Sequence, residues 1–133
     1  MPPYGAQSRE TRILIADDEP LLVKLLVDVL AADPRGLALD TATDGYEALI
    51  KVGAFRPTIL ILDVLMPGLD GIEVCRRLKA DHRGQAIKIL GITAHPAAIP
   101  ALIEAGADLC LAKPIDLVSL EQAIDRLLDP REV

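Results

Sequence analysis

Asp63 is an acidic residue at a position where an acid is costly. It directly follows Ile59–Leu62, an apolar run typical of a strand buried on both faces, and no basic residue adjoins it in the sequence. Burying an ionised carboxylate is expensive unless a positive charge pairs with it. The charge that neutralises Asp63 must therefore come from a distant part of the chain.

Polar residues also follow the first, fourth and fifth apolar runs of the chain. Asp17 and Asp18 end the first run, whereas Thr93 ends the fourth. Lys113 directly follows the fifth. In open sheets of parallel strands, ligands bind beyond the carboxyl ends of the strands. We therefore expect these four side chains to meet Asp63 at one edge of a sheet.

Such a cluster has a definite chemistry. Three carboxylates at ~4 Å would repel by roughly 4 kcal/mol per pair at an effective dielectric constant of 20. A hard divalent cation relieves this repulsion, and ligands that are all oxygen favour Mg²⁺. Asp63 is then placed to attack phosphorus and form an acyl phosphate. Lys113 can balance the charge of the transferred group, and the Thr93 hydroxyl can donate to one of its oxygens.

Each of these residues also has an ordinary structural explanation. One acid of the first run could cap the helix that follows it, which starts with a proline. Asp63 could cap a turn, Thr93 could simply end a strand, and Lys113 could be a solvated surface lysine. Only their joint placement favours one common site over four unrelated roles.

The elements that would position this site alternate along the chain. We expect strands at Ile13–Ala16, Leu37–Thr41, Ile59–Leu62, Ile87–Ile92 and Leu109–Ala112. We expect helices at Pro20–Ala32, Asp44–Ala54, Gly71–Ala80, Ile99–Ala105 and Leu117–Leu128. Strict alternation predicts an α/β fold: a five-stranded parallel sheet, doubly wound and flavodoxin-like, (βα)5, with strand order 2-1-3-4-5. Asp70 and Glu73 have the spacing of a capping box at the start of the third helix.

Length and composition limit the possibilities further. The 133 residues predict one domain over 12–129, with a flexible arm over 1–11 and a short tail over 130–133. A net charge of -6 argues against binding of nucleic acid by this domain. No apolar run approaches the ~18 residues of a membrane span, so we expect a cytoplasmic protein without membrane contact. Cys75 and Cys110 read as reduced packing residues, with a disulfide or metal pair as the alternative.

Four segments together resemble the signature segments of bacterial two-component response regulator receiver domains, in particular single-domain, chemotaxis-regulator-like ones. They are ILIADDEP at 13–20, ILDVLMPGLDG at 61–71, ILGITA at 89–94 and AGADLCLAKPI at 105–115. The resemblance implies that Asp63 is phosphorylated by a histidine kinase or a histidine phosphotransfer protein. It also implies that the Lys113–Pro114 peptide bond is cis.

The resemblance also assigns a metal site. Asp18 and Asp63 would bind Mg²⁺ directly, together with the backbone carbonyl of Leu65, while Asp17 would act mainly through water. Leu65 and His95 occupy positions at the rim of the pocket that influence hydrolysis of the acyl phosphate. An apolar Leu65 cannot orient water, whereas the imidazole of a histidine such as His95 can, so the sequence leaves the lifetime of the acyl phosphate open.

Two features depart from the receiver pattern. Cys110 stands where most members carry the Tyr or Phe that swings inward on activation. The segment from Thr93 to Gly106 is shorter than usual and contains two prolines, so we expect its helix to begin near Ile99 or Pro100 and to have about two turns. Because this helix and the fifth strand form the usual readout face, we expect signal output to differ from the common route.

The first helix carries an excess of apolar residues. Only Lys24 and Asp28 are polar in its central part, so some leucines must face solvent. Exposed apolar patches tend to mark partner surfaces. We therefore interpret Leu21 and Leu25 as a docking site for the histidine kinase. In receiver domains, as the resemblance implies, this helix lies beside the acidic pocket and binds the kinase. Tight packing in a leucine-rich core or in a dimer is the alternative.

The leading functional hypothesis is a phosphorylation-dependent switch that changes its binding to an unidentified downstream protein, either alone or as a homodimer. It would be an enzyme at most in catalysing its own phosphorylation and dephosphorylation. One alternative is the receiver fragment of a longer DNA-binding regulator or hybrid kinase. The other is a Mg²⁺-dependent phosphatase, which would need a second carboxylate at the position of Leu65.

Overall fold

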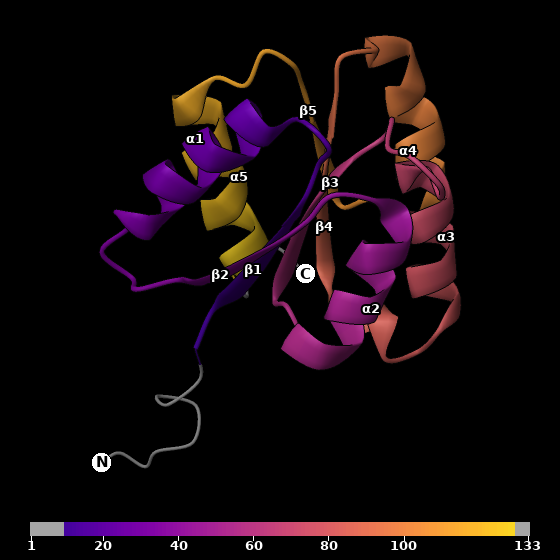
Figure 1. Cartoon of the computed structure of the whole chain (residues 1–133), viewed down its shortest axis with the longest axis horizontal. Coiled ribbons are helices and arrows are strands. Elements are labelled where there is room, and N and C mark those ends of the chain that lie inside the picture. The colour runs from indigo at the N-terminus through magenta and orange to yellow at the C-terminus, as the bar shows by residue number, and fades with distance from the viewer. Residues whose placement is uncertain (1–9, 130–133) are drawn as a thin grey trace.

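A single parallel sheet organises the molecule (Figure 1). The computed structural model describes residues 10–129, so the expected tail and most of the expected N-terminal arm lie outside the described residues. The strands are β1 (Arg12–Ala16), β2 (Ala38–Ala42), β3 (Ile59–Asp63), β4 (Lys88–Thr93) and β5 (Leu109–Ala112). Their order is β2-β1-β3-β4-β5 and every neighbouring pair is parallel, as the sequence predicts.

Helices cover both faces of the sheet. They are α1 (Pro20–Ala31), α2 (Gly45–Phe55), α3 (Gly71–Ala80), α4 (Ile99–Ala105) and α5 (Leu117–Leu128), with short 3-10 turns at Gly84–Ala86 and Pro96–Ala98. Figure 1 shows α1 and α5 on one face, and α2, α3 and α4 on the other. The predicted helices and strands are therefore all present, and no end differs from its predicted position by more than one residue.

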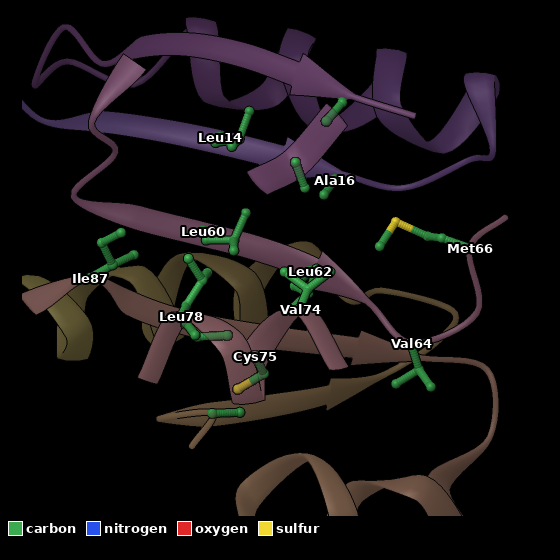
Figure 2. Close-up of a cluster of buried hydrophobic side chains, with 14 of the residues drawn as sticks. Leu14, Ala16, Leu60, Leu62, Val64, Met66, Val74, Cys75, Leu78 and Ile87 are labelled. Atoms are coloured by element: carbon green, nitrogen blue, oxygen red, sulfur yellow. The ribbon is translucent and has the colours of Figure 1, made fainter. Parts of the chain in front are cut away.

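The central strand β3 divides its side chains between two cores. Ile59 and Ile61 pack with residues of α1 and α5, whereas Leu60 and Leu62 pack with residues of α2, α3 and α4. Side chains alternate between the faces of a strand, so a fully apolar strand supplies both cores at once. Figure 2 shows the second core, with Leu60 and Leu62 beside side chains of α3.

Aspartates begin three of the helices. Asp44, Asp70 and Asp116 each accept a hydrogen bond from a backbone N–H of the first turn that follows. Of the capping box predicted at the start of α3, only the bond from the Glu73 N–H to the Asp70 side chain is present. The Glu73 carboxylate instead binds the guanidinium groups of Arg76 and Arg77 at 2.8 and 3.1 Å. Charge-assisted bonds to two arginines outcompete a bond to a neutral N–H.

Helix α4 is short, as its prolines predict. It has seven residues, starts at Ile99 and carries Pro100 in its first turn, where a missing N–H costs nothing. The Pro96–Ala98 turn connects it to β4. The predicted cis peptide bond between Lys113 and Pro114 is present.

Two glycines fix the β3–α3 loop, residues 64–70, over the end of β3. A Cβ added to Gly71 would lie 2.1 Å from the Asp63 carbonyl oxygen, and one added to Gly45 would lie 2.0 Å from the Leu69 carbonyl oxygen. The Gly71 N–H also donates to the Val64 carbonyl at 2.8 Å. The helices α2 and α3 therefore both begin in direct contact with the segment that follows Asp63.

We predict that Gly71→Ala lowers the free energy of unfolding by more than about 2 kcal/mol, because the methyl group overlaps rigid backbone. Gly53→Ala is the matched control: Gly53 also lies in a helix, but a Cβ there meets nothing within 4 Å. It should raise the free energy of unfolding by about 0.5–1 kcal/mol. Urea unfolding measures both, and equal effects of the two substitutions would contradict this packing.

Candidate functional site

The strand register brings the predicted residues to one edge of the sheet. Ala16 pairs with Leu62, so Asp17 and Asp63 are the next residues on neighbouring strands. On the other side of β3, Thr93 ends β4 and its carbonyl accepts a hydrogen bond from the Lys113 N–H at 2.7 Å. The four polar strand ends predicted to converge therefore share the carboxyl edge of the sheet.

Three carboxylates form the acidic part of this edge. Asp17, Asp18 and Asp63 each offer an oxygen, and the three atoms lie within 4.8 Å of one another. Asp17 is fully buried and Asp63 is 5% exposed, whereas Asp18 faces solvent. A cluster with one open side can exchange a ligand with solvent while its two other acids stay fixed.

Lys113 supplies the positive charge that Asp63 requires. Its Nζ lies 2.9 Å from Asp17 Oδ2 and 3.4 Å from Asp63 Oδ2. It also donates a short hydrogen bond to Oε1 of Glu19. Burial alone disfavours the charged ammonium, but the bonds to Glu19 and Asp17 outweigh it and raise the Lys113 pKa above its ordinary value. The lysine therefore stays charged and serves three acids.

The contact between Glu19 and Lys113 is not predictable from the sequence. Glu19 is the third acid after β1, but its side chain is exposed and it could equally face solvent. The structure joins it to Lys113, 94 residues away. The run of three consecutive acids was the only signal available in the sequence.

Asp63 is poised between neutral and ionised forms. Burial raises its pKa and the nearby Asp17 charge raises it further, while Lys113 lowers it, with a net value of about 6. The ordinary value for this carboxyl group is 3.8. Near neutral pH Asp63 is thus mostly an anion, and its ionisation lowers the stability of the folded protein.

The Thr93 hydroxyl is engaged within its own loop. Thr93 is 1% exposed, and its Oγ1 accepts a hydrogen bond from the His95 N–H at 2.9 Å and lies 3.3 Å from the His95 carbonyl oxygen. The His95 residue is exposed. The structure therefore places Thr93 at the carboxyl edge of the sheet, with its hydroxyl turned toward the backbone that leads into α4.

The two other positions singled out in the sequence lie on opposite sides of β4. Leu65 is 56% exposed in the β3–α3 loop. Cys110 is half-buried in β5. A Cβ added to Gly91 of β4 would lie 3.1 Å from its Sγ and would also meet the side chain of Leu102 in α4. Burial raises the pKa of the Cys110 thiol. Cys110 is thus a packing residue against α4.

Cys75 lies in the same core cluster that Cys110 packs against. It is fully buried, and burial raises the pKa of its thiol to about 11. Both cysteines carry free thiols. A raised pKa keeps them protonated and poorly nucleophilic at neutral pH.

The apolar excess of α1 is exposed as expected. Leu21 is 84% exposed and Leu25 is 47% exposed, while Leu26 and Leu30 of the same helix are buried against the sheet. The helix begins two residues after Asp18, so Leu21 lies in the turn next to the acidic edge and Leu25 about one turn further along. Within the described residues, no helix has the length and apolar character needed to cross a membrane.

The acidic edge fits a magnesium ion by its chemistry. Asp17 Oδ2 is buried and, apart from its ion pair with Lys113, has no hydrogen-bond partner among the described residues. The available donors are carboxylate and carbonyl oxygens, the ligands that Mg²⁺ prefers. The residues present therefore suit a hard divalent cation and not a soft one.

The sequence profile of the response regulator receiver domain matches residues 13–125. The chain belongs to this family. Among curated relatives, the DNA-binding response regulator MtrA of Mycolicibacterium smegmatis is 40% identical over 107 residues, covering 77% of this chain and 44% of that protein. Response regulator MprA of Mycobacterium avium is 39% identical over 119 residues, covering 88% and 50%. The receiver domain spans about half the length of the curated relatives it matches.

Solved structures agree with this assignment. A putative response regulator from Chloroflexus aurantiacus is 33% identical, with a TM-score of 0.84 and coverage of 90% of this chain and 98% of that one. The CheX–CheY–BeF₃–Mg complex from Borrelia burgdorferi is 26% identical, with a TM-score of 0.82 and 93% coverage of each chain. The fold predicted from the alternating strands and helices is confirmed, and so is the family inferred from the four sequence segments.

We predict that ionising Asp63 destabilises the metal-free receiver domain. Its folded-state pKa of about 6 exceeds the ordinary 3.8, so the stability that the bound proton contributes is complete below pH ~4 and is lost as pH rises through 6. Asp63→Asn should match the parent below pH 4 and exceed it by up to about 3 kcal/mol above pH 7 in EDTA.

Urea unfolding of both proteins from pH 4 to 8 measures this difference. Saturating Mg²⁺ should narrow it, because a cation that binds the ionised carboxylate stabilises the folded parent. A difference between the two proteins that does not change with pH would contradict the assignment.

Proposed function

We propose that the chain is a phosphorylation-dependent signalling switch in which Asp63 accepts a phosphoryl group in a Mg²⁺-dependent reaction. The observation that carries the proposal is the position of Asp63: a buried carboxylate beside Asp17, held by Lys113 at the open edge of the sheet. The donor in the cell would be a phosphohistidine of a kinase or of a phosphotransfer protein, the partners that membership of the receiver family implies.

Transfer is a substitution at phosphorus. A carboxylate oxygen of Asp63 forms the new P–O bond as the P–N bond to the donor histidine breaks, and the released imidazole nitrogen keeps the electron pair. Asp63 must be ionised to attack, and its pKa of about 6 allows this at neutral pH. Mg²⁺ bound by Asp18, Asp63 and the Leu65 carbonyl, with Asp17 acting through water, would offset charge on the phosphoryl oxygens.

Lys113 is the residue that we expect to respond first. It binds three carboxylates in the unphosphorylated protein, and phosphorylation of Asp63 replaces one of them with a group of larger negative charge. The ammonium group would turn toward the phosphoryl oxygens and loosen its bond to Glu19. Lys113 thereby stabilises both the transfer and its product.

Thr93 would carry the signal into α4. To donate to a phosphoryl oxygen, its hydroxyl must leave the His95 backbone, which it now binds. His95 precedes the Pro96–Ala98 turn and then α4, so the movement reaches that helix through three residues. With Cys110 in place of an aromatic ring, we propose that the loop and α4 themselves are the two-state element.

The lifetime of the phosphorylated form would depend on the two rim residues. Leu65 is apolar and exposed, so it offers no group that orients an attacking water. The same fact disfavours a phosphatase, which needs a general acid at that position. We therefore propose that, of the two rim residues, His95 is the one whose side chain affects the rate at which water hydrolyses the acyl phosphate.

A second candidate role concerns the protein as a whole. Because the curated relatives are about twice as long and several are named DNA-binding regulators, we propose as the alternative that the chain is the receiver part of such a regulator. In either case we propose a cytoplasmic location, a histidine kinase or phosphotransfer partner, and an unidentified downstream protein. A homodimer is one form in which the switch could act.

We predict that incubation with acetyl phosphate and Mg²⁺ adds one phosphoryl group to the chain, seen as an increase in intact mass. Asp63→Asn should abolish the addition, and EDTA should prevent it. Lys113→Ala should slow it by at least tenfold, since the transferring group loses its charge partner. Phosphorylation that survives Asp63→Asn would refute the assignment of the acceptor.

We predict that Leu21→Asp and Leu25→Asp weaken phosphotransfer from the cognate kinase at least tenfold, because both leucines are exposed beside the acidic edge. Ile50→Asp is the matched control, since Ile50 is 72% exposed on α2 on the other face of the sheet. All three variants should keep phosphorylation by acetyl phosphate. Normal transfer to both leucine variants would exclude the docking role.

A further inference from the structure

A cavity of about 620 Å³ lies at the edge of the sheet opposite Asp63. It opens between the helices α2 and α3, which lie side by side (Figure 1), near their carboxyl-terminal ends, and residues 81–87, which lead into β4, close it on a third side. Its apolar lining consists chiefly of Leu49, Val52, Leu78 and Ile87. Its volume falls within the range of ~300–1,000 Å³ typical of small-molecule sites.

The polar lining of this groove is mostly basic. Arg56, Arg77 and Arg83 face it together with a single acid, Asp81. The whole chain carries a net charge of -6, so this local excess of positive charge runs against the rest of the molecule. Guanidinium groups bind carboxylate, sulfonate and phosphate oxygens in pairs.

These arginines are available to a ligand. Among the described residues, no ion pair joins the guanidinium of Arg56, which lies in the left-handed conformation just after α2. Arg77 pairs with Glu73 at 3.1 Å, and Arg83 lies 3.7 Å from Asp81. Ion pairs between such exposed side chains contribute little to stability and can yield to a bound anion.

We propose that this groove binds a small amphipathic anion. The apolar body of the ligand would lie on Leu49, Val52 and Leu78, and its carboxylate, sulfonate or phosphate group would bind Arg56 and Arg77. Compensation of the helix dipoles would account for basic residues at the ends of α2 and α3. It does not account for the open apolar lining at Gly53, where an added Cβ meets nothing within 4 Å.

The test uses 8-anilinonaphthalene-1-sulfonate as the probe, and N-phenyl-1-naphthylamine as its uncharged counterpart with the same rings. The sulfonate probe should bind the folded chain with one-to-one stoichiometry, at least tenfold more tightly than the uncharged probe. The amide chemical shift changes that it causes should fall on the carboxyl-terminal ends of α2 and α3 and on residues 81–87. Fluorescence titration and two-dimensional NMR measure the two quantities.

Two pairs of variants locate the site. Gly53→Leu should weaken binding at least tenfold by filling the groove, while Gly53→Ala leaves binding within twofold and controls for helix propensity. Arg56→Gln and Arg77→Gln should each weaken it three- to tenfold. Arg76→Gln is the matched control for Arg77, because Arg76 also binds Glu73 but does not line the groove. Circular dichroism and urea unfolding confirm that each variant folds.

Several results would overturn the proposal. These are equal affinity for both probes, shift changes centred elsewhere such as on α1, or binding that survives Gly53→Leu. Absence of binding to the folded chain would also overturn it, and would leave the basic groove to an acidic segment of a partner protein. Asp63→Asn should leave affinity unchanged, so this inference stands or fails separately from the proposed phosphorylation.

Discussion

The contact of one ammonium group with three carboxylates holds the candidate site together. Lys113 binds Asp17, Asp63 and Glu19, and without it two buried acids would face each other with no counter-charge among the described residues. Strands in a sheet lie ~4.8 Å apart, so a residue at the end of β5 must reach about 10 Å to the line of β3. Only a long side chain on the correct strand end meets this requirement.

The site is costly to the fold that carries it. Burial and like charge shift Asp63 toward its neutral form, and the loop that follows it is held by glycines that leave no room for a methyl group. Such local conflicts are expected at functional sites, where the rest of the structure offsets them. Here the two apolar cores on either side of β3 provide that stability.

Much of this architecture could be predicted from the sequence because it rests on local pattern. The apolar period distinguishes strands from helices, Pro100 places the start of α4, and the polar strand ends converge once the strands are parallel. Side-chain rotamers and hydrogen-bond partners cannot be predicted in this way, because they depend on which residues the fold brings together. The Glu19 contact to Lys113 and the Thr93 bond to His95 belong to this second class.

The same distinction explains what the sequence concealed elsewhere. Glu73 has the spacing of a capping box, yet it turns to two arginines that lie on its own helix. The basic groove is assembled from residues of three separate segments, none of which forms a motif. By contrast, the exposure of Leu21 was foreseeable, since a helix on a sheet can bury only part of its circumference.

The most direct test of the account is binding of beryllofluoride, an analogue of the phosphoryl group, measured by calorimetry and by ¹⁹F NMR. If Asp63 is the acceptor in a magnesium site, beryllofluoride should bind the chain with one-to-one stoichiometry only when Mg²⁺ is present. Binding should disappear in Asp63→Asn and weaken in Lys113→Ala. Absence of binding by the folded parent, or binding that persists without Asp63, would contradict the account.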